Sequence, residues 1–558
     1  MLASLLLAAA TQSAPQLPAV IGRYEADRGA LDRLSPLDWT PGALDRMAAF
    51  LQAELAALPE NLPFSQLDQA DRVDFILLRN RIEHELRGIE HERVRQAEVD
   101  PLLPFAPPLI ELIEARMERR LAEPENSAAV LDAAARAVAD LRKAWEVVKP
   151  EVRPTIANRA AERCAELRDA LGSWQRFYAG YDPLFTWWCE EPFGRLERAL
   201  GEHQRALREK IGGLAPDDDQ QLIGDPLGRA ALLDELAFEM IPYSPEELIA
   251  IAERELAWCR ERWDESAAEM GYGSDRRAAL EAVKEMHVEP GQQPALIVTL
   301  ADEAADFLEA RNLVTVPALC RESWRLGMMS PERQKYTPYF TGGEVISIAF
   351  PTAGMEHGDK EMSLRGNNLP FCRATVHHEL IPGHHLQGFM ADRWNQHRAS
   401  FGTPFLGEGW ALWWEMHLWD LGFLRTAPDR IGALFWRSHR CARIIFSLKF
   451  HLGEWTPQQC VDFLVKEVGH EQRGAEAEVR RSIQGGYGPL YQCAYMVGGL
   501  QLRALHRELV TRGGLSEREF HDTVLQQNSI PIEMIRAIMK RQDLSPDYRG
   551  SWRFDEEN

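Results

Sequence analysis

Residues 371–387 read Phe-Cys-Arg-Ala-Thr-Val-His-His-Glu-Leu-Ile-Pro-Gly-His-His-Leu-Gln. Four of the 16 histidines of the chain fall within nine residues of this stretch, and Glu379 directly follows the first pair. Imidazole nitrogens and carboxylate oxygens are common protein ligands of zinc. A single histidine on an apolar helix is more often structural than a ligand, but four histidines with an embedded glutamate favour a metal site.

The spacing of these histidines differs from the His-Glu-x-x-His helix of metalloproteases, in which two imidazoles lie one turn apart and the glutamate is the general base. Here Pro382 stands four residues after His378. On an unbroken helix, His384 is rotated by about 600° from His378, and His385 lies roughly 10 Å away along the axis. Because proline breaks the helical hydrogen bonds and a glycine follows it, the sequence predicts a kinked or widened turn at 380–383. Such a turn brings a second imidazole back beside His378.

Two segments carry a family resemblance. Residues 375–387 resemble the zinc helix of the angiotensin-converting-enzyme-like peptidases with two residues inserted. The inserted form, His-Glu-x-x-Pro-Gly-His-His-x-Gln, is similar to that of the bacterial family known as domain of unknown function 885 (DUF885), which is considered related to the gluzincin metallopeptidases. Residues 407–415, Gly-Glu-Gly-Trp-Ala-Leu-Trp-Trp-Glu, resemble the Glu-Gly-Trp-Ala-Leu segment of this family.

The resemblance implies that Zn²⁺ is held by His378, His384 and Glu408, with Glu379 as the general base that acts on the zinc-bound water. Gluzincins take their third ligand from a glutamate on a following helix, and Glu408 lies 24 residues after His384. His384 is preferred to His385 as the second ligand, because the glycine before it completes the Gly-His pair of the related helix.

Three nearby residues are expected beside the ligands rather than among them. Glu415 lies seven residues after Glu408 on the same helix face, but the match to Glu-Gly-Trp-Ala-Leu favours Glu408 as the ligand. We expect Glu415 to support a ligand histidine, and His377 and His385 to orient the ligands or to contact the substrate.

The resemblance continues downstream of the ligands. Residues 485–499 resemble the family segment Pro-x-Gln-x-x-x-Tyr-x-x-Gly and place Tyr495 at its tyrosine. The resemblance implies that Tyr495 stabilises the oxyanion, with Tyr487 and Tyr491 as alternatives. Residues 478–481, Glu-Val-Arg-Arg, resemble a further segment of the family, which implies that Arg481 binds a substrate carboxylate.

Composition limits the partners of the chain. Its 558 residues are 45% hydrophobic and 27% charged, which is ordinary for a globular protein. The formal net charge of −22 disfavours nucleic acids and anionic membrane surfaces, and no apolar run is long enough to span a bilayer. Eight scattered cysteines without a Cys-x-x-Cys pair argue against a disulfide scaffold or a thiolate zinc site, and most are predicted to be buried.

Apolar periodicity and proline punctuation predict a mainly α scaffold. The resemblance adds a large gluzincin-like architecture with a deep cleft. We expect an N-terminal helical region at 16–312 and a zinc-peptidase-like region at 313–558, both within one continuous helical unit. Ser244 and Glu247 predict a capping box at the start of a helix over 245–269, and Ser516 and Glu519 predict another.

Short strands are predicted at 313–317 and 343–350, near the zinc helix. The second is either an edge strand that pairs with the substrate backbone or part of a structural hairpin. Residues 1–15 resemble the apolar part of a secretory signal with an Ala-x-Ala cleavage site, but no basic residue precedes it. They predict a periplasmic or secreted protein; the alternative is an N-terminal helix in a cytoplasmic one.

These patterns together predict a zinc-dependent hydrolase that cleaves short peptides. Two other functions fit the same residues. One is a metal-dependent amidase that acts on a non-peptide substrate, and the other is a catalytically silent helical binding protein. Only the two enzymes require a bound metal, so metal content separates them from the binding protein.

Overall fold

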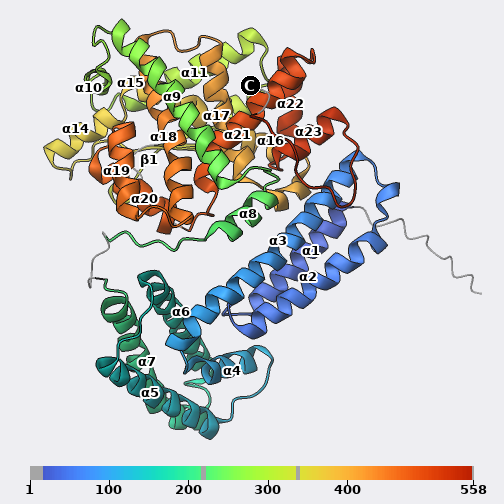
Figure 1. The fold of residues 1–558 in the computed structure, drawn as a ribbon, viewed down its shortest axis with the longest axis vertical. Helices are drawn as coiled ribbons and strands as arrows, with labels where there is room; N and C mark the ends of the chain where they lie inside the picture. The colour runs from blue at the N-terminus through green and yellow to red at the C-terminus, as the bar shows by residue number, and fades with distance from the viewer. Residues whose placement is uncertain (1–16, 215–220, 335–339, 485, 556–558) are drawn as a thin grey trace, which may run out of the picture. The chain divides into compact units, whose positions relative to one another are not determined.

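The computed structural model describes residues 17–214, 221–334, 340–484 and 486–555 (Figure 1). The predicted signal remnant at 1–15 lies outside these residues. The described chain is mainly helical and has one small sheet, which confirms the predicted fold class. None of its helices is both long and apolar enough to cross a membrane.

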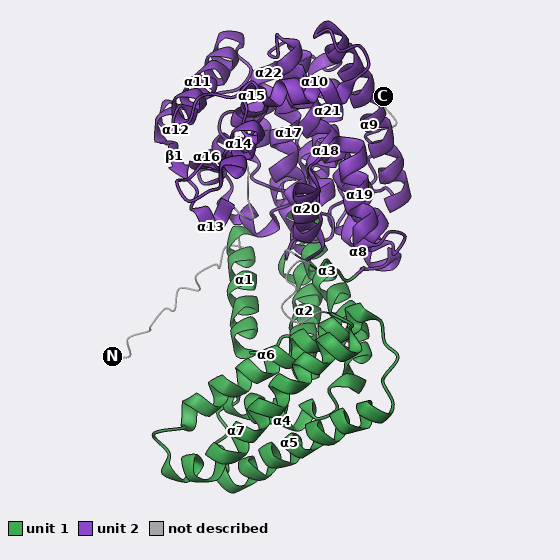
Figure 2. Cartoon of the chain, turned by 90° about the vertical axis from the view of Figure 1, so that its left-hand side faces the viewer, with its two compact units in different colours: residues 1–66, 79–225 green, residues 67–78, 226–558 purple. Residues whose placement is uncertain are grey.

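The chain divides into two compact units (Figure 2). The first contains residues 1–66 and 79–225, and the second contains residues 67–78 and 226–558. This division differs from the predicted boundary at 312, which lies inside the second unit. Residues 67–78 belong to the second unit because their polar groups bond within it. The Asp74 carboxylate, for example, accepts a hydrogen bond of 2.7 Å from Nε of Arg398.

In its described residues, the first unit consists of helices joined by short connections. Two of them, α2 and α7, begin with a capping side chain followed by proline, at Thr40 and Asp182. The helices are α1 (Leu17–Leu34), α2 (Pro41–Asn61), most of α3 (Gln69–Val99), α4 (Ala106–Met117), α5 (Pro124–Val147), α6 (Pro154–Tyr178) and α7 (Pro183–Ala206).

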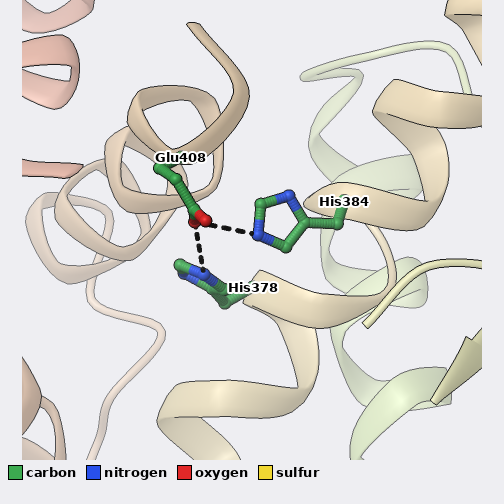
Figure 3. Close-up of side chains that lie close together, drawn as sticks. All are labelled: His378, His384 and Glu408. Atoms are coloured by element: carbon green, nitrogen blue, oxygen red, sulfur yellow. Dashed lines mark ion pairs between the residues drawn. The ribbon is translucent and has the colours of Figure 1, made fainter. Parts of the chain in front are cut away.

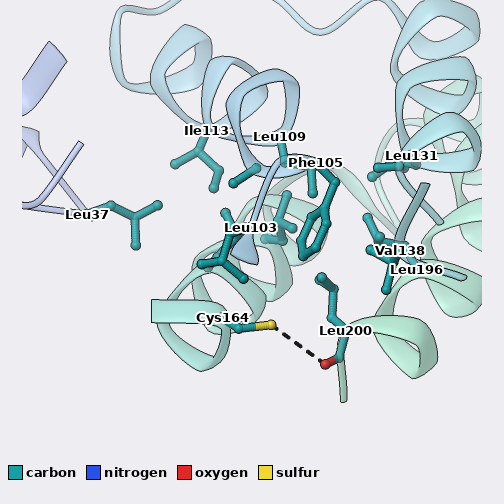
Figure 4. Close-up of a cluster of buried hydrophobic side chains, with 14 of the residues drawn as sticks. Leu37, Leu103, Phe105, Leu109, Ile113, Leu131, Val138, Cys164, Leu196 and Leu200 are labelled. Carbon is teal, nitrogen blue, oxygen red and sulfur yellow. Dashed lines mark hydrogen bonds between the residues drawn. The ribbon is translucent and has the colours of Figure 1, made fainter. Parts of the chain in front are cut away.

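The core of the first unit is apolar and contains one histidine. Figure 4 shows part of it, where side chains such as Phe105, Leu109 and Leu131 are buried. His203 is fully buried beside Phe105 and Trp145, with ring centroids 5.1 and 4.9 Å away. Its Nε2 lies 3.0 Å from the carbonyl oxygen of Leu102, to which it donates as a neutral ring. Burial lowers the pKa of His203 to about 4.

The second unit holds the remaining α-helices and the three strands. They are α8 (Arg229–Phe238), α9 (Pro245–Glu269), α10 (Arg276–Lys284), α11 (Gln293–Arg311), α12 (Ala318–Ser323), β1 (Arg325–Met328), α13 (Pro331–Gln334), β2 (Phe340–Thr341), β3 (Val345–Ile348), α14 (His357–Gly366), α15 (Leu369–Glu379), α16 (His384–Ala391), α17 (Pro404–Asp420), α18 (Ala427–His451), α19 (Pro457–Val468), α20 (Gln472–Gln484), α21 (Tyr491–His506), α22 (Glu517–Gln526) and α23 (Ile532–Lys540). The capping boxes predicted at Ser244 and Ser516 are both present and begin α9 and α22. All eight cysteines are free and buried.

The small sheet has the order β1-β3-β2. The prediction of a strand within 343–350 is confirmed by β3, which pairs in parallel with β1 and antiparallel with β2. Because β3 is the central strand, its interpretation as a free edge strand is wrong, and the structural hairpin is the arrangement observed.

The strand predicted at 313–317 is also wrong. No strand forms there, because side chains of α22 take the backbone hydrogen bonds that a strand would need. The Asp522 carboxylate accepts from the Thr315 amide at 2.8 Å, and Nδ1 of His521 lies 2.8 Å from the Leu313 carbonyl oxygen.

Two glycines allow α17 and α21 to pack at close range. A Cβ atom placed on Gly409 of α17 would lie 2.6 Å from Cα of Gly498 on α21. A Cβ atom on Gly498 would in turn overlap the carbonyl oxygen of Phe405. The backbones therefore touch where no side chain fits.

We expect Gly409→Ala to destabilise the protein by about 1–3 kcal/mol, because the added methyl group forces the two helices apart. Gly407→Ala, two residues earlier on the same helix, is the matched control, since a Cβ there meets no atom within 4 Å. That change should be neutral or stabilise by up to about 1 kcal/mol through helix propensity. Urea denaturation of both variants measures the difference, and equal effects would contradict the close packing.

The buried His203 makes stability depend on pH. Its folded pKa of about 4 lies below the usual histidine pKa of 6.5, so the unfolded chain takes up the proton first as the pH falls. The neutral His203 contributes roughly 3 kcal/mol to the free energy of unfolding above pH 6.5, and this contribution is lost as the pH falls towards 4. Unfolding free energies at pH 7.5 and 4.5 should therefore differ less in His203→Gln than in the wild type. His357→Gln, at an exposed histidine, is the control and should retain the wild-type difference.

Candidate metal centre

The helix that begins at Leu369 ends at Glu379, and a new helix begins at His384. The linking residues, Leu380 to Gly383, are not helical and contain a cis Ile381–Pro382 peptide bond. The chain returns so closely that a Cβ atom on Gly383 would overlap the carbonyl oxygen of His378. The predicted distortion at 380–383 is confirmed, and it is a complete break between α15 and α16 rather than a widened turn.

This break brings His378 and His384 to the same carboxylate, that of Glu408 on α17 (Figure 3). Nε2 of His384 lies 3.2 Å from Oε2 of Glu408, and Nε2 of His378 lies 3.8 Å from the same oxygen. One ligand atom from each residue lies within 4.8 Å of the other two. Oε2 of Glu408 is buried and receives no hydrogen bond of good geometry from the described residues. Two imidazole nitrogens and one carboxylate oxygen, arranged in this way, fit a zinc ion.

Neighbouring side chains hold the three residues in this orientation. Nδ1 of His378 lies 2.7 Å from Oε1 of Glu415, which also accepts a 3.3 Å hydrogen bond from Arg440. The Nδ1 proton therefore faces Glu415, which leaves the lone pair of Nε2 directed towards Glu408. The Tyr491 hydroxyl donates a short hydrogen bond to Oε1 of Glu408. Glu415 thus lies where the sequence predicted support for a ligand histidine.

The carboxylates set the protonation of the site. Burial lowers the pKa of His384, but attraction to Glu408 and Glu379 outweighs burial and raises the pKa to about 9. Burial likewise opposes ionisation of Glu415, yet Arg440 and His378 hold its pKa below the usual value. Without a metal, His384 is therefore a cation paired with Glu408.

Glu379, the predicted general base, lies against the turn between β2 and β3. The backbone amide of Gly343 donates a 3.3 Å hydrogen bond to the Glu379 carbonyl oxygen. A Cβ atom on Gly342 would overlap the Glu379 carboxylate. Only glycine at 342 leaves room for this carboxylate, so the turn fixes where Glu379 can point.

Tyr495 also lies at the centre. Its ring is parallel to that of His378 to within 14°, at a centroid distance of 6.4 Å, and the guanidinium of Arg443 lies 4.6 Å from the same ring. Burial raises the pKa of Tyr495 to about 12, so its hydroxyl stays protonated. The ring centroid of Tyr491 lies 5.9 Å from that of Tyr495, and Tyr491 is the tyrosine that donates a hydrogen bond to the predicted ligand Glu408. Because Tyr491 and Tyr495 are four residues apart on α21, they lie on the same face of that helix. This spacing is the sequence pattern that indicates both side chains belong to one site.

His377 and His385 do not join the ligand set. Nε2 of His385 lies 2.8 Å from the carbonyl oxygen of Cys320 and links α16 to α12. Nδ1 of His377 lies 2.8 Å from the carbonyl oxygen of Arg373, and burial lowers the pKa of His377 to about 4. The structure thus brings together His384 and not His385 with the other two predicted ligands.

Arg481 of α20 lies near the tyrosines. Its guanidinium is 5.0 Å from the ring centre of Tyr487, which is 4.4 Å from the ring of Tyr491. Among the described residues, no carboxylate lies within ion-pair distance of Arg481, and its buried Nε has no hydrogen-bond partner. By contrast, the neighbouring Arg443 bonds Glu478 at 2.7 Å.

Sequence reasoning missed two residues of the centre. Arg440 on α18 neutralises the buried Glu415, but nothing in the local pattern of arginines on that helix distinguishes it. Gly342 touches Glu379, and its only signal was the Gly-Gly pair before the predicted strand.

Two solved structures resemble the chain over nearly its whole length. One is described as "a putative lipoprotein of unknown function" from Shewanella oneidensis; it shares 17% identity with a TM-score of 0.68 and covers 95% of this chain and 100% of its own. The other, "the putative lipoprotein" from Colwellia psychrerythraea, shares 14% identity with a TM-score of 0.55 and covers 94% and 99%. At such identities the likeness concerns the fold alone. No curated protein sequence matches the chain significantly.

Residues 18–539 match the family described as "bacterial protein of unknown function (DUF885)". The match spans both compact units and includes every residue of the candidate metal centre. The chain therefore belongs to the DUF885 family.

Proposed function

We propose that the protein is a zinc-dependent peptidase that cleaves short peptides. The observation that carries this proposal is the convergence of His378, His384 and Glu408, whose ligand atoms lie within 4.8 Å of one another, with the charge of Glu379 close enough to act on His384. Three protein ligands and one open position are the arrangement of catalytic rather than structural zinc sites.

A zinc ion held by these three residues would polarise the scissile carbonyl group and lower the pKa of a water molecule to about 7. The Glu379 carboxylate takes a proton from that water and later delivers it to the departing amine. The turn at Gly342 keeps the carboxylate directed for both transfers. Tyr495, protonated because its pKa is raised, donates a hydrogen bond to the developing oxyanion.

Arg481 gives the proposed site a preference for anionic substrates. Arg440 and Arg443 are already paired with Glu415 and Glu478, whereas the guanidinium of Arg481 has no carboxylate within ion-pair distance among the described residues. A substrate carboxylate supplies the missing partner.

We further propose export to the periplasm or beyond. Two observations support it: the apolar, alanine-rich residues 1–15, and the description of two structures of similar fold as putative lipoproteins. Fractionation of the native host with an antibody tests this location.

The ligand assignment predicts which histidines bind zinc. His384→Ala should reduce tightly bound zinc by about one ion per chain, since it removes one of three protein ligands. His385→Gln is the matched control one residue later; it should keep the wild-type zinc content, because His385 bonds Cys320 instead. Mass spectrometry of protein purified without chelator measures both. Zinc loss in the control together with retention in His384→Ala would refute the assignment.

The role of Glu379 predicts a separation of binding from turnover. Glu379→Gln should retain zinc and lose hydrolysis by roughly 10²–10⁴-fold, the usual contribution of a general base. A library of dipeptides and tripeptides supplies the substrates, and non-peptide amides test the amidase alternative. Wild-type rates in the variant would eliminate the mechanism. Cleavage of non-peptide amides alone would make the protein an amidase.

A further inference from the structure

A second group of metal-binding side chains lies at the other end of α17, where this helix meets α21 and α22. It consists of His417 on α17, His506 at the end of α21, and Glu517 and His521 on α22. The three histidine rings are at least nine-tenths buried, whereas the Glu517 side chain is 29% exposed. Three imidazoles around one carboxylate, all in the second unit, have no part in the proposed hydrolysis.

Within this group, the ligand atoms of His417, Glu517 and His521 lie within 4.8 Å of one another, and His506 contacts the same glutamate. Nε2 of His506 lies 2.8 Å from Oε2 of Glu517, and Nε2 of His417 lies 3.3 Å from the same oxygen. The centroids of the His417 and His506 rings are 4.9 Å apart, and those of His378 and His384 are also 4.9 Å apart. Each group therefore places two imidazoles next to one oxygen of a single glutamate.

The hydrogen bonds within the group distinguish its histidines. Nε2 of His521 accepts a 3.0 Å hydrogen bond from the indole of Trp413, so its Nδ1 carries the proton and donates to the Leu313 carbonyl oxygen at 2.8 Å. Both nitrogens of His521 are occupied. In contrast, Nε2 of His417 is buried and makes no hydrogen bond of good geometry to any described residue. This unsatisfied nitrogen points to a ligand that the protein itself does not supply.

Glu517 supplies the carboxylate of this group, and the imidazoles of His506 and His417 both face its Oε2. A carboxylate and two imidazoles suit zinc and similar divalent transition metals, which imidazole prefers over magnesium or calcium. The partial exposure of Glu517 leaves room for solvent at a fourth position.

We propose that His417, His506 and Glu517 form a second binding site for a zinc-like divalent ion, framed by His521. The ion is not part of a two-metal catalytic centre, whose ions lie about 3.5–4 Å apart. Nine residues separate Glu408 from His417 on α17, which correspond to about 13 Å of rise and to opposite faces of the helix. The second ion connects α17, α21 and α22, and its role is to stabilise their packing.

Metal stoichiometry tests the proposal independently of any activity. Protein stripped with a chelator, reloaded with Zn²⁺ and dialysed should contain two ions per chain. Glu517→Gln, a change of similar shape at a partly exposed side chain, should contain one, and so should His384→Ala. The double variant should contain none. The melting temperature of wild-type protein should rise in two steps as zinc is added, and that of Glu517→Gln in one.

The outcomes separate the two sites. One ion in the wild type that is retained in Glu517→Gln and lost in His384→Ala would overturn the second site and leave the proposed peptidase centre intact. One ion with the reverse pattern would support the second site alone. Two ions in Glu517→Gln would also overturn the proposal. If the variant does not fold, zinc-edge anomalous diffraction from wild-type crystals decides, because the proposal requires a peak between His417 and Glu517.

Discussion

The approach of α17 to the break between α15 and α16 is the contact on which the candidate centre depends. Glu408 faces the two histidines across this contact. Trp410, two residues later, donates a 2.7 Å hydrogen bond from its indole to the Pro382 carbonyl oxygen, and Gln387 of α16 bonds the Leu406 carbonyl oxygen. The same stretch of α17 therefore carries a predicted ligand and satisfies the Pro382 carbonyl oxygen, which the broken helix cannot pair with itself. A shift of α17 would move Glu408 away from the two histidines and would also break the hydrogen bond to Pro382.

Buried arginines of α18 balance the charge around this contact. Arg440 pairs with Glu415, and Arg443 pairs with Glu478. Such pairs add little net stability, since removal from water offsets most of their attraction. Their effect here is positional. Arg440 keeps Glu415 ionised at Nδ1 of His378, and Arg443 lies over the face of Tyr495. Helix α18 thus orients one predicted ligand and one predicted donor.

Features that depend only on neighbouring residues could be predicted from the sequence. The capping boxes at Ser244 and Ser516, the interruption at Pro382 and the family itself could all be predicted from short segments. The ligand trio could be predicted because the motif match supplied the long-range pairing of α16 with α17. Its geometry agrees with that prediction, whereas its metal and its reaction stay predictions.

Other features depend on tertiary contacts that no short segment encodes. Residues 313–317 have the composition of a strand, but Asp522 and His521 satisfy its backbone from a helix more than 200 residues later. The pairing of β3 on both sides, the direction of His385 towards Cys320 and the division of the chain near residue 225 have the same cause. The three predicted ligand side chains of the candidate centre also differ in exposure: 3% for His378, 12% for Glu408 and 23% for His384. An ion bound there would therefore lie nearest to solvent on the His384 side.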